Sequence, residues 1–179
     1  MNNFNVLIDT NIIIPLEDTA RTLDVRLAEI RRICSENSVV IKIHPEQQQD
    51  LLRDKDESRR AIVMSRKEQY SEIQQPPLWE TDELNSFAIT QSNENDKVDN
   101  SLLCAVYKNA VRFLITEDKE IHNKAKKLGI AERVYYIDQF FGFLHKEFDK
   151  PTSIPPLGIR NLKRRKGQRL REKYAKAKQ

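Results

Sequence analysis

Two apolar segments of this 179-residue chain each end at an acidic residue. Asp9 directly follows the run 6–8, and Asp118 comes shortly after the run 113–115. A short apolar run between polar residues predicts a buried strand, and ligands bind in the crevice beyond the carboxyl ends of parallel strands. We therefore expect Asp9 and Asp118 to bring two carboxylates to one site.

Two more acidic residues stand near the start of predicted helices. Asp50 follows Pro45, a residue favoured in a first helical turn, and Asp99 precedes an apolar stretch that includes Leu102. Clustered carboxylates repel one another unless a cation lies between them, and oxygen ligands suit Mg²⁺ or Mn²⁺ rather than Zn²⁺. Such a cluster predicts a divalent-cation site, in which two ions about 4 Å apart can activate a water molecule.

The strand-end acids also have a structural interpretation. Asp9 and Asp118 could simply cap the elements that follow them, as Asp often does at a helix N-terminus. Their polar neighbours point to a functional role, because Thr10, Asn11 and Thr116 can hold the turns and orient the carboxylates.

The acids of the predicted helices leave more alternatives open. Asp54 lies one turn after Asp50, where an exposed helix of mixed charge would look the same. Glu46 is a rival to Asp50 for the same position. Asp96, three residues before Asp99, could cap a helix or lie in a second shell around the metal.

The elements that must position these carboxylates alternate between strand and helix. Apolar runs and helical spacing predict strands at 4–8, 39–43, 112–116 and 134–137, and helices at about 19–35, 45–70, 99–109, 118–128 and 138–146. Residues 80–95 read as a loop that could hold a short element around 84–89. This alternation predicts an α/β fold, a three-layer α/β/α sandwich around a central, mostly parallel sheet. The prolines at 151, 155 and 156 predict one domain over 1–150, followed by a linker and basic tail over 151–179.

Charge is divided unevenly along the chain. Residues 160–179 hold ten Lys or Arg residues and one Glu, a net charge of +9, so the rest carries −5 of the overall +4. Such a tail is typical of nucleic-acid contact, although a solvated tail or a surface helix has the same composition. With no apolar run near the roughly 20 residues that cross a membrane, no secretory signal and two isolated cysteines, we expect a cytoplasmic protein with no membrane partner.

Together these motifs resemble the PIN-domain nucleases over most of residues 4–145. The resemblance rests on Leu7-Ile8-Asp9-Thr10-Asn11, on Leu114-Ile115-Thr116-Glu117-Asp118, and on Asp99 at the head of an apolar helix. It implies a Rossmann-like sandwich and a metal-dependent ribonuclease whose acidic positions are Asp9, Asp50, Asp99 and Asp118, with Asp54 and Asp96 as further candidate ligands. The family usually carries Glu where this chain has Asp50, and the shorter side chain puts activity in question.

The resemblance further implies Mg²⁺ or Mn²⁺ as the cofactor and RNA as the substrate, with DNA left open because a metal site reads phosphate and not the 2′-hydroxyl. We expect phosphate contacts from basic residues beside the second acidic position and in the tail, namely Arg53, Arg59, Arg60, Lys163, Arg164 and Arg165. Two other functions stay open: a PIN-fold module that binds nucleic acid or protein without cutting, and a toxin held by an inhibitor protein.

Analogy with the family also bears on assembly. PIN proteins commonly pair, so a homodimer is the expectation. The segment from Lys42 to Arg60 resembles a bacterial variant in which an acetyltransferase-like domain follows the PIN domain, which would make this chain part of a longer protein.

His44 and Trp79 have open roles. His44 stands at a predicted strand end and could contact substrate, whereas Trp79 follows Pro76-Pro77 and could stack on a base. Packing inside the fold is the alternative interpretation for both side chains.

Overall fold

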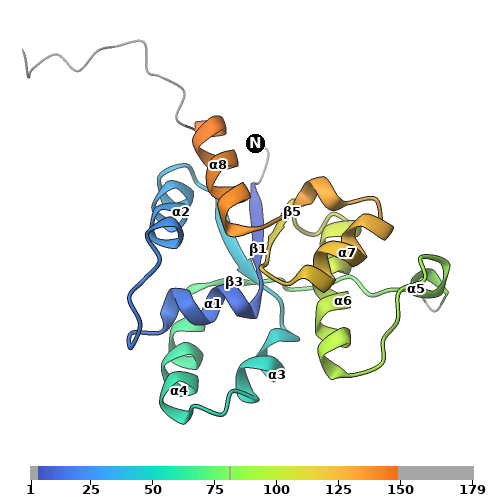
Figure 1. Cartoon of the computed structure of the whole chain (residues 1–179), viewed down its shortest axis with the longest axis horizontal. Coiled ribbons are helices and arrows are strands. Elements are labelled where there is room, and N and C mark those ends of the chain that lie inside the picture. The colour runs from blue at the N-terminus through green and yellow to red at the C-terminus, as the bar shows by residue number, and fades with distance from the viewer. Residues whose placement is uncertain (1–3, 81, 149–179) are drawn as a thin grey trace, which may run out of the picture. The chain divides into compact units, whose positions relative to one another are not determined.

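A computed structural model describes residues 4–80 and 82–148, which form an α/β/α sandwich (Figure 1). The sheet has five parallel strands in the order β3-β2-β1-β4-β5, with β1 Asn5–Ile8, β2 Val40–Ile43, β3 Ser71–Glu72, β4 Phe113–Ile115 and β5 Val134–Tyr135. The α-helices of these ranges are α1 Thr10–Glu17, α2 Val25–Glu36, α3 Gln47–Leu52, α4 Glu57–Arg66, α5 Glu83–Ser86, α6 Glu94–Tyr107, α7 Lys119–Lys127 and α8 Ile137–Phe148. The predicted fold class is confirmed.

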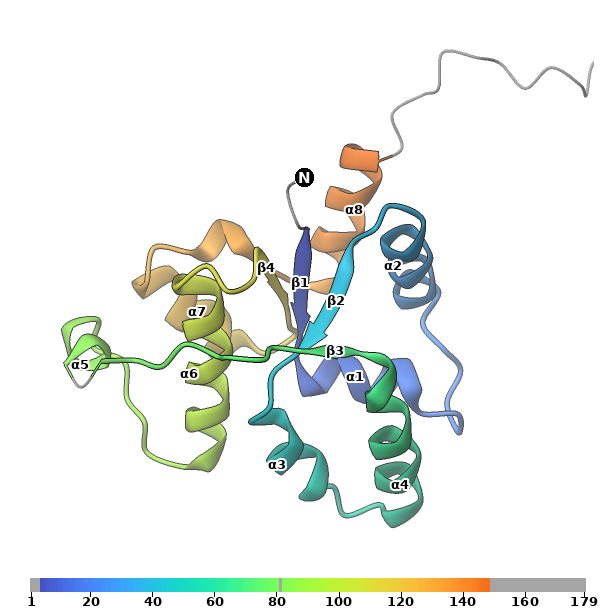
Figure 2. The same ribbon diagram turned by 180° about the vertical axis from the view of Figure 1, so that it is seen from behind.

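Alternate residues of the central strands enter two separate cores. Val6 and Ile8 of β1 pack into the core that α1, α2, α4 and α8 share, whereas Leu7 faces the core of α6 and α7. This follows from the strand geometry, in which successive side chains point to opposite faces of the sheet. Seen from behind, α2 and α8 again lie on one side of the sheet and α6 and α7 on the other (Figure 2).

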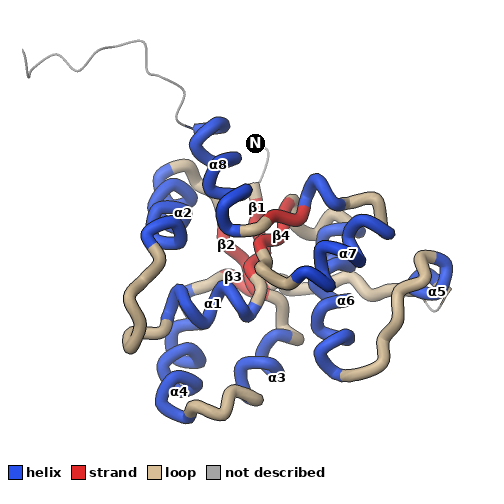
Figure 3. Tube along the Cα trace, viewed as in Figure 1, coloured by secondary structure: helices blue, strands red, loops and turns tan. Residues whose placement is uncertain are grey.

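The helix predicted at 45–70 is two helices, so that prediction was wrong (Figure 3). Helix α3 gives way to a turn at Arg53, and α4 starts after Asp56, whose carboxylate accepts a hydrogen bond from Arg59 N at 3.0 Å. In the turn, Asp54 accepts one from Asp56 N at 3.1 Å. Short acidic side chains compete with the helical backbone in this way, which explains the break.

Four further elements differ from expectation. Helix α2 begins at Val25, six residues after the expected start. Helix α1 was not predicted, because the run Ile12-Ile13-Ile14-Pro15 favours extended structure, yet Ile12 and Ile13 are fully buried. Strand β3 is too short to give a pattern. Helix α6 begins at Glu94, five residues before the expected start, because the Asn93 side chain caps it.

The structure shows how the two side chains with open roles, Trp79 and His44, are placed. Trp79 Nε1 donates to Asn100 O at 2.7 Å and its ring lies 5.3 Å from that of Tyr107, so Trp79 packs inside the fold. His44 is buried, and its Nδ1 accepts from Glu46 N at 3.2 Å. Cys34 and Cys104 are free and buried.

Some expectations fall on residues that the structure does not describe. The predicted linker and tail, with Lys163, Arg164 and Arg165, lie outside the described ranges. Within 4–80 and 82–148, no helix is both long enough and apolar enough to span a membrane.

Candidate active site

A cavity of about 750 Å³ brings together acidic side chains from separate elements at the carboxyl end of the sheet. Asp9 follows β1 and Asp118 precedes α7, while Asp50 belongs to α3 and Asp99 to α6. Strands β1 and β4 are neighbours, and the chain continues from them toward opposite faces of the sheet, which opens a crevice at this point. The four acidic residues predicted from the sequence therefore line one cavity.

Both carboxylate oxygens of Asp9 are held by hydrogen bonds. Thr10 N donates to Oδ1 at 2.6 Å, and the Thr116 hydroxyl donates to Oδ2 at 2.6 Å. The same hydroxyl oxygen accepts from Asn11 Nδ2 at 3.2 Å and from Asp118 N at 3.0 Å. One buried hydroxyl thus connects the two strand ends, in the orienting role predicted for Thr116 and Asn11, whereas Thr10 contributes through its main chain.

The capping interpretation of the strand-end acids is also confirmed. Asp9 is the N-cap of α1, and Asp118 is the N-cap of α7, where its Oδ1 accepts from Glu120 N at 2.6 Å. Capping fixes each carboxylate at the rim of the cavity and leaves Asp118 Oδ2 without a hydrogen bond among the described residues. The two roles are therefore compatible.

Burial and mutual repulsion perturb the acids of the cavity. Burial raises the pKa of Asp9 to about 6, and the charges of Asp118 and Asp50 add to the rise, although two hydrogen bonds oppose it. Burial also raises the pKa of Asp99 to about 7, with Lys124 opposing and the other three acids adding. Perturbed carboxyl groups of this kind gather at functional sites, and a cation in the cavity would lower their pKa values again.

The wall formed by α3 and the start of α4 carries ion pairs of its own. Asp50 pairs with Arg53, which lowers the pKa of the Asp50 carboxyl, although burial raises it by more. Asp54 accepts two hydrogen bonds from Arg59, each of 2.6 Å, and these hold its pKa at about 2. Asp54 therefore stays ionised and paired with Arg59. It lies in the turn between α3 and α4, and not on the same helix as Asp50 as expected.

The basic residues expected to meet phosphate are placed unequally. Arg53 and Arg59 line the cavity, whereas Arg60 is not part of its lining and donates through Nη1 to Asp54 O at 2.8 Å. Lys55, which was not among the expected contacts, lines the cavity, is exposed and has no ion pair within the described ranges. Lys55 is therefore the basic side chain of this wall most available to a phosphate.

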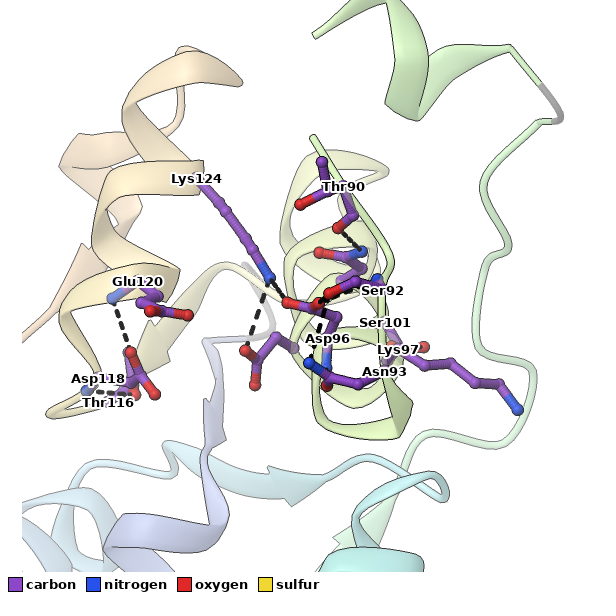
Figure 4. A network of polar contacts seen from close by, with 12 residues as sticks. Thr90, Ser92, Asn93, Asp96, Lys97, Ser101, Thr116, Asp118, Glu120 and Lys124 are labelled. Atoms are coloured by element: carbon purple, nitrogen blue, oxygen red, sulfur yellow. Dashed lines mark hydrogen bonds and ion pairs between the residues drawn. The ribbon is translucent and has the colours of Figure 1, made fainter. Parts of the chain in front are cut away.

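Lys124 of α7 is not part of the cavity lining, but it pairs with two lining acids of α6 (Figure 4). Its Nζ lies 2.9 Å from Asp96 Oδ1 and 3.6 Å from Asp99 Oδ2. The other oxygen of Asp96 accepts from Ser92 N at 3.0 Å and Ser92 Oγ at 2.6 Å. Bonds from Ser92 and Lys124 hold the pKa of Asp96 well below its usual range, so this carboxylate is ionised and satisfied at the start of the helix.

The donor set of the cavity can be compared with what a divalent cation needs. Its acidic side chains offer only oxygen, the ligand that Mg²⁺ and Mn²⁺ prefer. Across residues 4–80 and 82–148, however, no three acidic, histidine or cysteine side chains are grouped closely enough to hold an ion as they stand. The chemistry of the set suits such a cation, and the side chains would have to move toward it.

Sequence reasoning missed Lys124, although the pattern of α7 contains a signal for it. Ile121, Ala125 and Leu128 are the buried positions of this helical stripe, and Lys124 stands among them. A lysine on the buried face of a helix needs a carboxylate partner. That position therefore indicates an ion pair inside the fold, although it does not identify the partner.

No protein-family model matches this sequence, and no curated protein matches it. Its function is therefore inferred from the residues and the geometry of the cavity.

Proposed function

We propose that this chain is a PIN-type nuclease that hydrolyses RNA phosphodiester bonds with the help of Mg²⁺ or Mn²⁺. One observation carries the proposal: Asp9, Asp50, Asp99 and Asp118 come from four separate elements and line one cavity at the carboxyl end of a parallel sheet. The raised pKa values of Asp9 and Asp99 support it, because burying clustered acids is costly unless they serve a cation.

Asp9 and Asp118 are the residues that we assign to the cation. Neither has an ion pair in the described part of the chain, whereas Asp50 and Asp99 face the same cavity and already have one partner each. A divalent ion held there would activate a water molecule and stabilise the charge that develops on the phosphate. Thr116 keeps Asp9 and the start of α7 in place, so the strand-end carboxylates are oriented before substrate arrives.

The basic wall of the cavity would position the substrate. Lys55 and Arg53 line the same cavity as Asp118, where they can bind phosphates of a nucleic acid strand. Such contacts fix the position of the strand without reading its sequence. The basic residues of 160–179 add attraction for any polyanion, which falls as salt concentration rises.

A second candidate function is a module that binds nucleic acid without cutting it. The arrangement of ligands favours this candidate, because within residues 4–80 and 82–148 no three metal-ligating side chains lie close enough together to hold an ion as they stand. Asp50 also has a shorter arm than the Glu of the family and is paired with Arg53.

Cleavage of an end-labelled single-stranded RNA distinguishes the two candidates. We expect wild-type protein to cut in Mn²⁺ and not in EDTA. Asp9→Asn should lower the rate by at least about 100-fold, because a bound metal ion supplies several kcal/mol of transition-state stabilisation. Asp138→Asn, which removes an exposed acid of α8, is the control and should cut normally. Binding without cutting by the wild type supports the second candidate, and neither binding nor cutting contradicts both.

A further inference from the structure

We infer that Lys124 is the resident cation of this site and takes the place of a second divalent ion, so that the cavity binds one Mg²⁺ or Mn²⁺ rather than two. The inference rests on the proposed nuclease function and departs from the two-ion centre expected from the sequence. It is based on where the cavity's ion pairs lie and on how firmly each one is held.

Lys124 is part of the interior of the fold. The residue is only 9% exposed, and its ammonium group bridges Asp96 and Asp99 from a different helix (Figure 4). A buried ammonium remains charged only where carboxylates pair with it. Removing it would leave two carboxylates uncompensated at the start of α6, which is the situation that attracts a metal ion.

The ion pairs divide the cavity into a neutralised part and an uncompensated part. The acids on α3, α6 and the α3–α4 turn each have a basic partner, through Arg53, Arg59 or Lys124. Among the described residues that line the cavity, Asp9, Asp118 and Glu120 have none, and Glu120 is exposed. Asp9 and Asp118, which hydrogen bonds hold in place at the strand ends, are therefore the uncompensated pair that one divalent ion would join.

The two kinds of ion pair also differ in mobility. Arg53 belongs to an i, i+3 pair at the surface and its side chain is 42% exposed, so it can release Asp50 into water at little cost. The Lys124 side chain is 11% exposed, and Ser92 fixes its partner Asp96 through two further hydrogen bonds. Asp50 can therefore turn toward an incoming ion, whereas the α6 side keeps Lys124.

Counting bound ions tests this inference directly. Free Mn²⁺ measured by electron paramagnetic resonance, at fixed ionic strength, gives the number of ions bound per chain without relying on activity. We expect one Mn²⁺ for the wild type and two for Lys124→Met, which removes the charge at similar length. Lys124→Arg keeps the charge and should bind one. Lys126→Met removes a charge from an exposed position of the same helix and should also bind one.

The outcomes separate this inference from the proposed function. Two ions in the wild type, or one in folded Lys124→Met, would overturn the inference and leave the nuclease proposal standing. No bound Mn²⁺ in the wild type would overturn both. If Lys124→Met does not fold, Lys124→Gln takes its place, because its amide can still donate to Asp96 and it is likewise expected to bind two ions.

Discussion

Replacing Thr116 by valine removes the one hydroxyl that joins the two strand ends of the cavity. Thr116 is fully buried, donates to Asp9 Oδ2 at 2.6 Å, and accepts from Asp118 N and Asn11 Nδ2. Valine has nearly the same shape and makes none of these three bonds. The substitution therefore separates the hydrogen bonds from the packing.

The expected cost follows from the partners that are left. The bond to the ionised Asp9 is worth about 1.5–3 kcal/mol and the bond from Asp118 N about 0.5–1.5 kcal/mol, while water can reach the exposed Asn11. We expect Thr116→Val to lower the free energy of unfolding by about 2–4 kcal/mol. The pKa of Asp9 should rise further above about 6, because a bond that favours its charged form is lost.

Urea unfolding of the wild type, Thr116→Val and Thr116→Ser at neutral pH measures this cost. Serine keeps the hydroxyl and loses one methyl group, so we expect it to cost about 1 kcal/mol. RNA cleavage should follow the same order, with serine retaining activity and valine losing it. Equal stability of the two variants would refute the role given to the hydroxyl.

Three other predictions concern one acid of the cavity and two buried side chains elsewhere in the fold. In EDTA, the folded-state pKa of Asp99, about 7, lies above its unfolded value of 3.8, so the folded wild type loses stability as pH rises from about 4 to 7. The advantage of Asp99→Asn in free energy of unfolding should therefore grow by about 2–3 kcal/mol between pH 5 and pH 8, and a constant difference in urea titrations would contradict this. Gln47, which is 1% exposed, bonds main-chain groups at the ends of β1 and β2 at 2.9 and 2.7 Å. Gln47→Ala should cost about 2–4 kcal/mol, against less than about 0.5 for the exposed Gln49→Ala, and similar losses would show that these bonds contribute nothing. Tyr70→Phe removes the hydroxyl that donates to buried Glu17 and should cost about 1–3 kcal/mol by thermal unfolding, whereas an unchanged midpoint would argue against that bond.

The sequence predicted the parts of the fold that burial alone determines. Strands β1 and β4 are buried on both faces, so they read as short apolar runs, and the acids that follow them could be placed at one edge of a parallel sheet. Helix α1 escaped notice because its isoleucines and Pro15 have poor helical propensity, which packing of Ile12 and Ile13 overrides. Local helical propensity therefore did not predict this helix, because tertiary contacts outweigh it.

The acids of the candidate site could be predicted from the sequence, but the basic residues that pair with them could not. The cavity contains the four expected acids because strand ends and helix starts meet at the switch point of the sheet. Which basic residue pairs with each acid depends on side-chain reach across elements: Arg59 turns back to Asp54, and Lys124 crosses from α7 to α6. Such pairings have no fixed spacing along the chain.

The claim that Asp9 anchors a divalent cation is tested most directly by unfolding the wild type and Asp9→Asn with and without Mn²⁺ at matched ionic strength. An ion at a hundredfold excess over its dissociation constant stabilises the folded state by about 2.7 kcal/mol. We expect this gain in the wild type and none in Asp9→Asn, which should itself fold because it removes a buried charge. An equal gain in both proteins, or no gain in either, would contradict the claim.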